Sequence, residues 1–179
     1  MLKWVMFVTL VAMRMKENFT SISRGTVLQS PGEVGGCFYE VKSGLLRSFI
    51  INAEGKESTY LFGPAGWVVG DAVSAQEPRI LYIEAIEDSV VKVIQKANFA
   101  EMPQTVDTIR LQRLHRRILV MQQRILMLMS ASALERYEHF VQTYPDILQR
   151  VPQRMVASYL GITPEALSKI KKRSLQGIS

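Results

Sequence analysis

The chain has 179 residues, of which 47% are hydrophobic, and it carries a formal net charge of +6 at neutral pH. This length supports one large domain or two small ones, and this hydrophobic content excludes a disordered protein. The single cysteine, Cys37, excludes a disulfide framework and a cysteine-ligated iron–sulfur cluster within one chain. We expect it to be a small buried hydrophobic residue in a cytoplasmic protein.

The first segment, Met1–Lys16, contains an apolar run from Trp4 to Met13. This run is too short to span a bilayer, and Arg14 and Glu17 stand where a signal peptide would have a small-residue cleavage site. We therefore predict a helix that packs on the next domain, and no membrane partner.

Short β-type runs alternate with glycines from Asn18 to about Ile94, and Asn52–Gly55 has the composition of a hairpin turn. Evenly spaced short strands with turn signals predict an antiparallel sandwich or a jelly-roll-like β-roll. The expected strands are Phe19–Ile22, Thr26–Gln29, Cys37–Val41, Leu45–Ile51, Ser58–Phe62, Ile80–Ala85 and Val90–Ile94.

A jelly roll is also the shell of metal-dependent oxygenases and isomerases, which need histidine and carboxylate ligands on their strands. Both histidines, His115 and His139, fall on predicted helices outside the β region. No pairing of a nucleophile with a base is evident either. We therefore expect no metal, no cofactor and no enzymatic activity.

After a short helix near residues 97–102, a long helix is predicted from Gln104 or Thr105 to about Met129. Its apolar residues recur at alternating spacings of three and four, a heptad pattern that predicts a parallel homodimer. The residues of this seam are Leu111, Leu114, Ile118, Met121, Ile125 and Leu128.

The alternative is that the long helix lies along the β-roll, and we expect it to do both because apolar residues cover more than one of its faces. The additional apolar residues are Leu119, Val120, Leu126 and Met127. Beside the seam, Arg110, Arg117 and Arg124 repeat every seven residues, but His115 and Gln122 on the other flank are not acidic. Interhelical ion pairs are therefore not expected to fix the dimer.

The segment Ser132–Glu135 has the pattern of a capping box, so a new helix begins there after a hinge at Ser130–Ser132, and it stops at Pro145. Its expected buried residues are Leu134, Tyr137, Phe140 and Val141. A short turn at residues 146–151 leads to the next element.

Two short helices joined by a tight turn are predicted over Gln153–Lys172. Gly161 makes the turn with a positive φ, and Thr163 caps the second helix with Pro164 at its first position. Ala157 supplies the small residue that a steep helix crossing needs. The shared apolar face consists of Val156, Leu160, Ile162, Leu167 and Ile170.

The opposite face of the second helix is polar and basic, which suits a helix presented to the major groove of DNA. The alternative is an ordinary helical hairpin with a solvated face. Residues 150–179 carry six basic residues against one acidic residue, so a polyanion would bind at this end. The predicted DNA-contacting residues are Thr163, Glu165, Ser168, Lys169, Lys172 and Arg173.

A β-roll, a long dimer helix and a helix-turn-helix in this order resemble the CRP/FNR family of bacterial transcription regulators, over nearly the whole chain. The segments that carry the resemblance are Val41–Arg47, Asn52–Lys56, Ile83–Asp88 and Ala157–Arg173. Within the last, Ala157–Glu165 is most similar to the branch common in Bacteroidetes-type bacteria. The resemblance implies a DNA-binding homodimer, with RNA polymerase as a further partner.

In this family a glutamate and a basic residue one turn later read bases, and Glu165 and Lys169 match those positions. A carboxylate can accept from cytosine N4, and a lysine can donate to guanine O6 and N7. Pro164 stands where the family often has an arginine, which can alter the sequence preference. The family's β-hairpin wing has no room in Asp146–Pro152, so we expect few phosphate contacts and modest affinity per subunit, with a steep salt dependence.

Cyclic-nucleotide-binding members of the family use a Gly-Glu pair for the ribose and an Arg-Ser or Arg-Thr pair for the cyclic phosphate. The nearest matches here are Gly70–Asp71 and Arg79–Ile80, in which the carboxylate is shorter and isoleucine cannot donate to phosphate. Ile118 and Leu119 also stand where cyclic-AMP-binding members have hydroxyl groups. We therefore do not expect cyclic AMP to bind. The candidate effector residues are Gly70, Asp71 and Arg79. Arg79 could hold an anion, although a salt bridge at a loop end is the role we expect.

We thus predict an α+β fold in three parts: an effector β-roll with an N-terminal helix over residues 1–103, a dimerisation helix over 104–130, and a helix-turn-helix domain without an evident wing over 131–179. The predicted function is sequence-specific DNA binding by a homodimer on a near-palindromic operator, with the β-roll as a sensor of an unknown small molecule or as a structural platform. The alternative is a ligand-binding β-roll whose helical end binds a protein partner.

Overall fold

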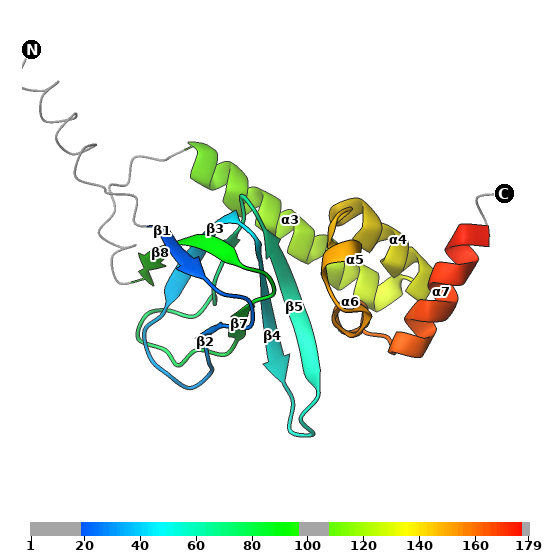
Figure 1. Ribbon diagram of the computed structural model, residues 1–179, viewed down its shortest axis with the longest axis horizontal. Coiled ribbons are helices and arrows are strands. Elements are labelled where there is room, and N and C mark those ends of the chain that lie inside the picture. The colour runs from blue at the N-terminus through cyan, green and yellow to red at the C-terminus, as the bar shows by residue number, and fades with distance from the viewer. Residues whose placement is uncertain (1–18, 97–107, 177–179) are drawn as a thin grey trace, which may run out of the picture.

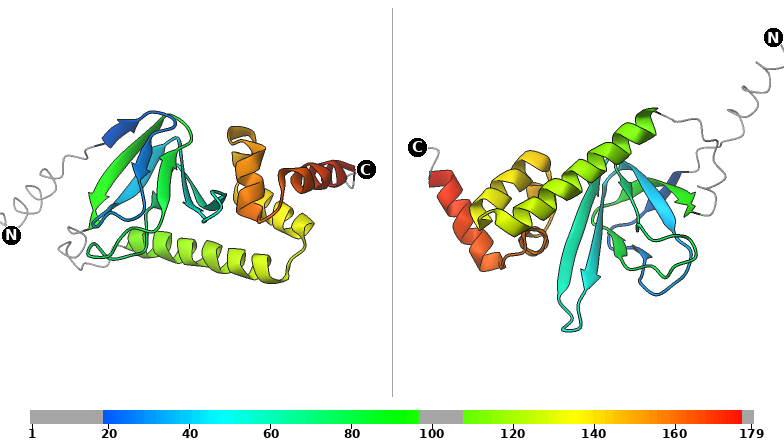
Figure 2. Two further views of the ribbon diagram at one scale, coloured as in Figure 1. Left: turned by 90° about the horizontal axis from the view of Figure 1, so that it is seen from below. Right: turned by 180° about the vertical axis from the view of Figure 1, so that it is seen from behind.

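A β domain and a helical unit lie side by side, and one long helix runs along both of them (Figures 1 and 2). The structure is a computed structural model that describes residues 19–96 and 108–176. The helices predicted near residues 1–16 and 97–102 lie outside this range. Within it, no helix has the length and apolar character needed to cross a membrane.

The β domain is built from β1 (Phe19–Ile22), β2 (Val27–Gln29), β3 (Cys37–Ser43), β4 (Leu45–Ile51), β5 (Glu57–Pro64), β6 (Val68–Val69), β7 (Tyr82–Ala85) and β8 (Ser89–Gln95). They form two antiparallel sheets with the orders β1-β8-β3-β6 and β2-β7-β4-β5. Most paired strands are distant in sequence, as in the predicted jelly-roll-like β-roll. The α+β fold class is therefore confirmed.

Most of the predicted strands have a boundary that differs from the structure by one or two residues, and β6 was not predicted. The strand expected at Ile80–Ala85 begins at Tyr82, because the backbone amides of Ile80 and Leu81 donate to the Asp71 carboxylate at 2.7 and 3.0 Å instead of to a strand. Strand β6 has only two residues, which is too short for a sequence pattern to reveal.

The predicted hairpin turn between β4 and β5 is confirmed. The amide of Asn52 donates to the carbonyl of Lys56 at 3.0 Å, and Gly55 has a φ of 79°. The Asn52 side-chain oxygen accepts from the amides of Glu54 and Lys56 at 3.1 and 2.9 Å, which holds the turn closed. The hairpin projects away from the rest of the β domain (Figure 1).

The helices are α3 (Thr108–Ser130), α4 (Ala133–Thr143), α5 (Ile147–Arg150), α6 (Gln153–Leu160) and α7 (Pro164–Gln176); α4–α7 make up the helical unit. Helix α4 begins at the predicted capping box. The Ser132 hydroxyl oxygen accepts from the Glu135 amide at 3.3 Å, and the Glu135 carboxylate accepts from the Ser132 amide at 2.6 Å. The chain turns between α3 and α4 at the segment predicted as a hinge.

The burial of Leu134 and of Cys37 differs from the prediction. Leu134 keeps 37% of its surface exposed, because the buried face of α4 is formed by Tyr137 and Phe140 and continues to Tyr144 after the helix ends. Cys37 is only half-buried, because it lies at the first residue of β3, where the strand enters the sheet.

The sheet β2-β7-β4-β5 buries apolar residues on both of its faces. On the inner face, Leu46 and Ile83 share a core with Val41 and Val91 of the other sheet. Phe62 on the outer face packs against the helical unit, and its ring centroid lies 5.7–6.2 Å from those of Phe140, Tyr144 and Tyr159. The β domain and the helical unit therefore share one apolar core.

A charged contact also joins the two parts. Both Arg150 Nε and Nη2 in α5 donate to the Glu87 carboxylate, at 2.8 and 2.7 Å, and Nη2 also donates to the Gly44 carbonyl at 3.1 Å. This hydrogen bonding by Arg150 lowers the pKa of Glu87 below its ordinary value.

We predict that Glu87→Gln destabilises the protein at neutral pH but not in acid. A carboxyl whose pKa is lower in the folded state contributes stability above the unfolded-state pKa and loses it as the pH falls through the folded-state pKa. Because solvent screens this half-buried pair, we expect a loss of about 1 kcal/mol at pH 7. Urea unfolding at both pH values measures it, with Glu54→Gln in the exposed hairpin turn as control. An equal loss at both pH values would contradict the prediction.

Candidate functional site

Helices α6 and α7 form the predicted helix-turn-helix. Gly161 ends α6 in the left-handed conformation, with a φ of 67°, and the amide of Ile162 donates to the Ala157 carbonyl at 3.0 Å. The Thr163 hydroxyl oxygen then accepts from the amide of Ala166 at 3.2 Å and caps α7, which begins at Pro164. These are the roles that the spacing of the residues predicted.

The predicted apolar face is buried between the two helices and the rest of the helical unit. Ala157, the small residue at the crossing, is 1% exposed, and Leu167 is fully buried. Ile162 in the turn is half-buried and packs against the same core. The other buried members are Val156, Leu160 and Ile170.

The opposite face of α7 is open to solvent. The predicted DNA-contacting residues, which are Thr163 at the cap and Glu165, Ser168, Lys169, Lys172 and Arg173 in the helix, are all exposed. Ser168 uses its hydroxyl hydrogen within the helix, donating to the Pro164 carbonyl at 3.0 Å. Hydrogen bonds from its own amide and from the Thr163 side chain lower the pKa of Glu165, so it is an ionised acceptor at neutral pH. The arrangement presents one anion and several cations along a single exposed helix face.

The described part of the helical unit contains no β-hairpin beside this helix pair. Residues between α4 and α6 form the short helix α5 instead. This agrees with the prediction that the segment Asp146–Pro152 has no room for a wing.

Most of the apolar seam predicted on α3 is exposed in the single chain. Leu114, Ile118 and Ile125 keep 54%, 54% and 57% of their surface exposed. Leu111 and Leu128 are exposed as well, and Met121 is half-buried. Such a contiguous apolar stripe is typical of a surface that binds another protein chain.

The contact of α3 with the β domain is made partly by arginines, which differs from the expectation. Of the four apolar residues expected to pack on the β-roll, Val120 and Met127 are half-buried, whereas Leu119 and Leu126 are 42% and 54% exposed. Arg117 donates instead to the carbonyl of Gly70 at 3.0 Å, and Arg124 donates to carbonyls of β5. The seven-residue repeat of arginines was the sequence signal for this face, but its partners are main-chain atoms that no sequence pattern identifies.

A groove of about 660 Å³ lies between α3 and the β domain. Its walls are mostly apolar, and Asp71 and Arg117 are the charged side chains that line it. The apolar lining comes mainly from Phe38, Ala72, Leu114, Ile118, Met121, Ile125 and Leu126. A volume of this size suits a small organic molecule.

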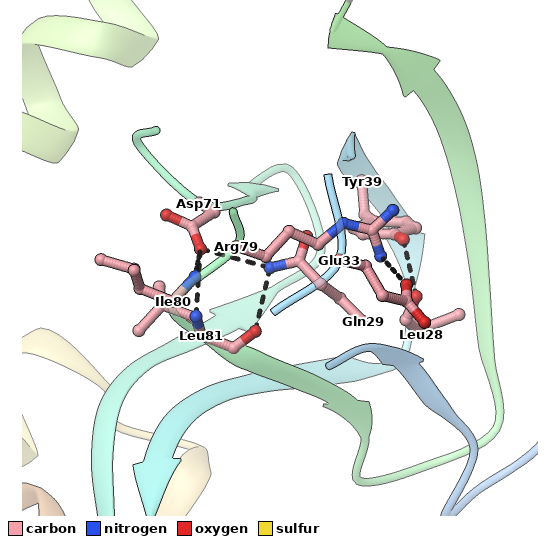
Figure 3. A network of polar contacts seen from close by, with 8 residues as sticks. All are labelled: Leu28, Gln29, Glu33, Tyr39, Asp71, Arg79, Ile80 and Leu81. Carbon is pink, nitrogen blue, oxygen red and sulfur yellow. Dashed lines mark hydrogen bonds and ion pairs between the residues drawn. The ribbon is translucent and has the colours of Figure 1, made fainter. Parts of the chain in front are cut away.

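Asp71 lines this groove, and both Asp71 and Arg79 are bound by neighbouring residues (Figure 3). Asp71 is fully buried, and its carboxylate accepts from the amides of Ile80 and Leu81 and, at 3.4 Å, from the Gln29 side-chain amide. Arg79 pairs with Glu33 at 3.0 Å, which is the salt bridge at a loop end that we expected.

These contacts limit what the effector residues can do chemically. The Asp71 carboxylate holds the loop that returns to β7, so it is not free to bind a ribose hydroxyl with the oxygen that accepts these bonds. Arg79 is directed toward Glu33 (Figure 3) and is not one of the residues that line the groove. Among the described residues, no cluster of histidine, cysteine and acidic side chains could hold a metal ion.

Comparison with known proteins identifies the β domain. Residues 19–105 match the family described as the cyclic nucleotide-binding domain, a span that contains all the strands described above. The β domain belongs to the cyclic nucleotide-binding domain family. No curated protein matches the chain.

Solved structures share the fold of the whole chain. FixK2 from Bradyrhizobium japonicum has a TM-score of 0.75 and 20% identity, covering 90% of this chain and 86% of that one. The c-di-GMP responsive global regulator CLP from Xanthomonas campestris has a TM-score of 0.70 and 17% identity, covering 96% and 93%. TTHA1359, a CRP/FNR family transcriptional regulator from Thermus thermophilus, has a TM-score of 0.65 and 19% identity, covering 89% and 87%.

The chain therefore joins a cyclic nucleotide-binding domain to a helical unit in the fold of CRP/FNR family regulators, as the resemblance implied. The closer similarity to a Bacteroidetes-type branch and the boundaries of the three predicted domains stay predictions. In this cyclic nucleotide-binding domain, the effector roles of Gly70, Asp71 and Arg79 also stay predictions.

We predict that Gly161→Ala destabilises the helix-turn-helix by about 1–2 kcal/mol, the cost of a left-handed conformation for a residue with a Cβ atom. A Cβ atom here would lie 3.4 Å from Arg136 Nη1 and 3.5 Å from Leu128 Cδ2, so backbone strain rather than a clash sets the cost. Gly161→Asn should lose less, because asparagine tolerates this conformation. Thermal unfolding compares the two variants, and equal losses would argue against strain as the cause.

Proposed function

We propose that this chain is a sequence-specific DNA-binding transcription regulator that acts as a homodimer. The observation that carries the proposal is the exposed basic face of α7, which is held by a helix-turn-helix with a left-handed Gly161 and a capped second helix. The second helix of this motif enters the major groove in proteins that read DNA. The shared fold with regulators that include a CRP/FNR family member supports the same conclusion.

Four of the exposed residues of α7 divide between two tasks in this proposal. Glu165 and Lys169 lie one helical turn apart and contact base edges, with the carboxylate accepting from cytosine and the lysine donating to guanine. Lys172 and Arg173 neutralise phosphates, and Thr163 and Ser168 lie at the same surface. The contacts with base edges set the preferred sequence, and the contacts with phosphates set the salt dependence of affinity.

The exposed stripe on α3 supports the homodimer. Ile118 and Ile125 lie two turns apart at equivalent heptad positions, and both are more than half exposed. Pairing two such helices in parallel removes these side chains from water and places two copies of α7 on one side of the assembly. Recognition helices of such dimers contact half-sites about 34 Å apart, one turn of DNA, on a near-palindromic operator.

The β domain is the proposed sensor for an unidentified small molecule, or a structural platform if no ligand exists. The groove beside Asp71 is the place where a ligand would bind. We do not propose cyclic AMP, because Ile80 offers no side-chain donor and Arg79 already pairs with Glu33. RNA polymerase as a further partner and a cytoplasmic location follow from the proposed activity.

Selection of bound duplexes from a random pool, with the full-length protein, tests the proposal. We expect enrichment of a near-palindromic site, and binding that weakens steeply as salt rises. A protein that binds neither the selected pool nor heparin in dilute buffer would overturn the proposal. That outcome would favour the alternative of a ligand-binding β domain whose helical unit binds another protein.

We predict that Glu165→Ala and Lys169→Ala each change the preferred base at one position of each half-site, at a cost of about 1–3 kcal/mol on the wild-type site. Arg173→Ala is the matched control, because losing a phosphate contact should weaken all sequences alike and reduce the salt slope by about one. Competition binding against single-base variants of the selected site measures both effects. Unchanged base preference in both α7 variants would contradict the assignment.

We predict that Ile118→Asp converts the dimer to a monomer and abolishes tight binding to the palindromic site, because a carboxylate would be buried in the apolar seam. Gln123→Asp, on an exposed position of α3 outside the seam, should leave the dimer intact. Sedimentation velocity gives the mass of each variant. Equal masses for wild type and Ile118→Asp would rule out the proposed interface.

A further inference from the structure

Strand β5 lies at the edge of its sheet and is covered by side chains from two helices rather than by another strand. The sheet order β2-β7-β4-β5 leaves one side of β5 without a strand neighbour. A strand edge carries unpaired amide and carbonyl groups, which need partners when they are buried. In this molecule the partners come from α3 and α6.

Ser158 in α6 binds β5 with both functions of its hydroxyl group. The oxygen accepts from the Thr59 amide at 2.9 Å, and the hydrogen is donated to the Glu57 carbonyl, also at 2.9 Å. These are the main-chain groups that a neighbouring strand would otherwise satisfy. The first helix of the helix-turn-helix is thereby joined directly to the β domain.

Arg124 in α3 completes the contact and joins three elements. Its Nη2 donates to the Thr59 carbonyl at 2.8 Å and to the Tyr159 carbonyl of α6 at 3.1 Å, and its Nη1 donates to the Tyr60 carbonyl. The guanidinium lies 4.1 Å from the centre of the Tyr159 ring. Within the described residues no carboxylate pairs with Arg124, so main-chain carbonyls and an aromatic ring stabilise its charge.

The same contact adjoins the groove. Tyr60, whose carbonyl binds Arg124, lines the groove with its own atoms. Arg117, one heptad earlier on α3, also lines it and donates to Gly70. The contact that holds α6 against the β domain through Arg124 therefore lies beside the groove.

We propose that Arg124 and Ser158 are positioning residues that fix the orientation of the helix-turn-helix relative to the β domain and, through this orientation, the half-site spacing that the protein accepts. The first half of this statement concerns the single chain and is independent of DNA. The second half rests on the proposed function, because orientation matters for activity only if α7 reads DNA. Neither residue belongs to the exposed face of α7.

Distances between the two parts test the first half. Spin labels at Ser21→Cys on β1 and Gln142→Cys on α4, in a Cys37→Ser background, report the separation of the β domain and the helical unit. Mixing with excess unlabelled protein keeps the measurement within one chain. We expect a narrow distance distribution for the wild-type sequence and a broad or shifted one for Arg124→Met, with a smaller change for Ser158→Ala and a partial return in Arg124→Lys.

Arg136→Met is the matched control. Arg136 also donates to a carbonyl of α6, that of Leu160 at 2.8 Å, but no hydrogen bond among the described residues joins it to a β-strand. This variant should therefore keep the narrow distribution. If the double variant Arg124→Met, Ser158→Ala folds by circular dichroism and keeps the wild-type distribution, the proposal is wrong. If that variant does not fold, Ser158→Ala alone decides, and an unchanged distribution overturns the proposal.

Half-site spacing tests the second half with a readout that stability alone does not change. On operators whose half-sites are moved by one base pair, the wild-type protein should lose affinity, whereas Arg124→Met should lose much less. Arg136→Met should behave like the wild type. Equal spacing preference in all three proteins would overturn the second half of the proposal. Failure of the wild type to bind any duplex would instead overturn the proposed function and leave the distance result standing.

Discussion

One sheet has to bury both of its faces, and the arrangement of the whole molecule follows from this constraint. Strand β4 is buried continuously from Leu45 to Phe49. It therefore lacks the alternation of buried and exposed residues that is typical of a strand with one solvent-exposed face. Its inner residues pack on the other sheet and its outer residues face the helical unit. The β domain and the helical unit are therefore not independent bodies joined by a linker, because separating them would expose apolar surface.

The positive charge of the chain is used in two different ways. Several arginines are bound internally: Arg47 is 1% exposed and pairs with Glu57 and Glu84, and Arg150 pairs with Glu87. On α3, Arg117 and Arg124 donate to main-chain carbonyls of the β domain. The cations on the outer face of α7 are exposed to solvent instead. Net charge thus overstates what is available to a polyanion, and the location of the exposed cations is more informative than their sum.

Local rules explain which features the sequence could predict. The helix-turn-helix follows from Ala157, Gly161 and Thr163, because caps, a left-handed glycine and a small crossing residue act within a few residues of one another. The capping box at Ser132 and the hairpin turn at Asn52 are local in the same sense. The apolar heptads of α3 could also be recognised in the sequence, but the sequence of one chain does not show which surface covers them.

The features that were missed depend on contacts between distant parts of the chain. Ser158 binds the main chain 99 and 101 residues away, and Arg124 binds carbonyls 64 and 65 residues away. Backbone atoms are the same for every residue type, so no sequence pattern marks them as partners. The late start of β7 has a similar origin, since Asp71 captures amides that β-propensity assigns to a strand.

The covering of β5 by helices has a consequence for the β domain on its own. Without α3 and α6, the open side of this strand would offer a row of free amides and carbonyls to any extended chain, which is the usual route to domain swapping and fibrous aggregation. By covering the edge of β5, α3 and α6 therefore prevent the β domain from pairing with another chain through this strand. A shortened protein that ends after β8 is therefore expected to aggregate.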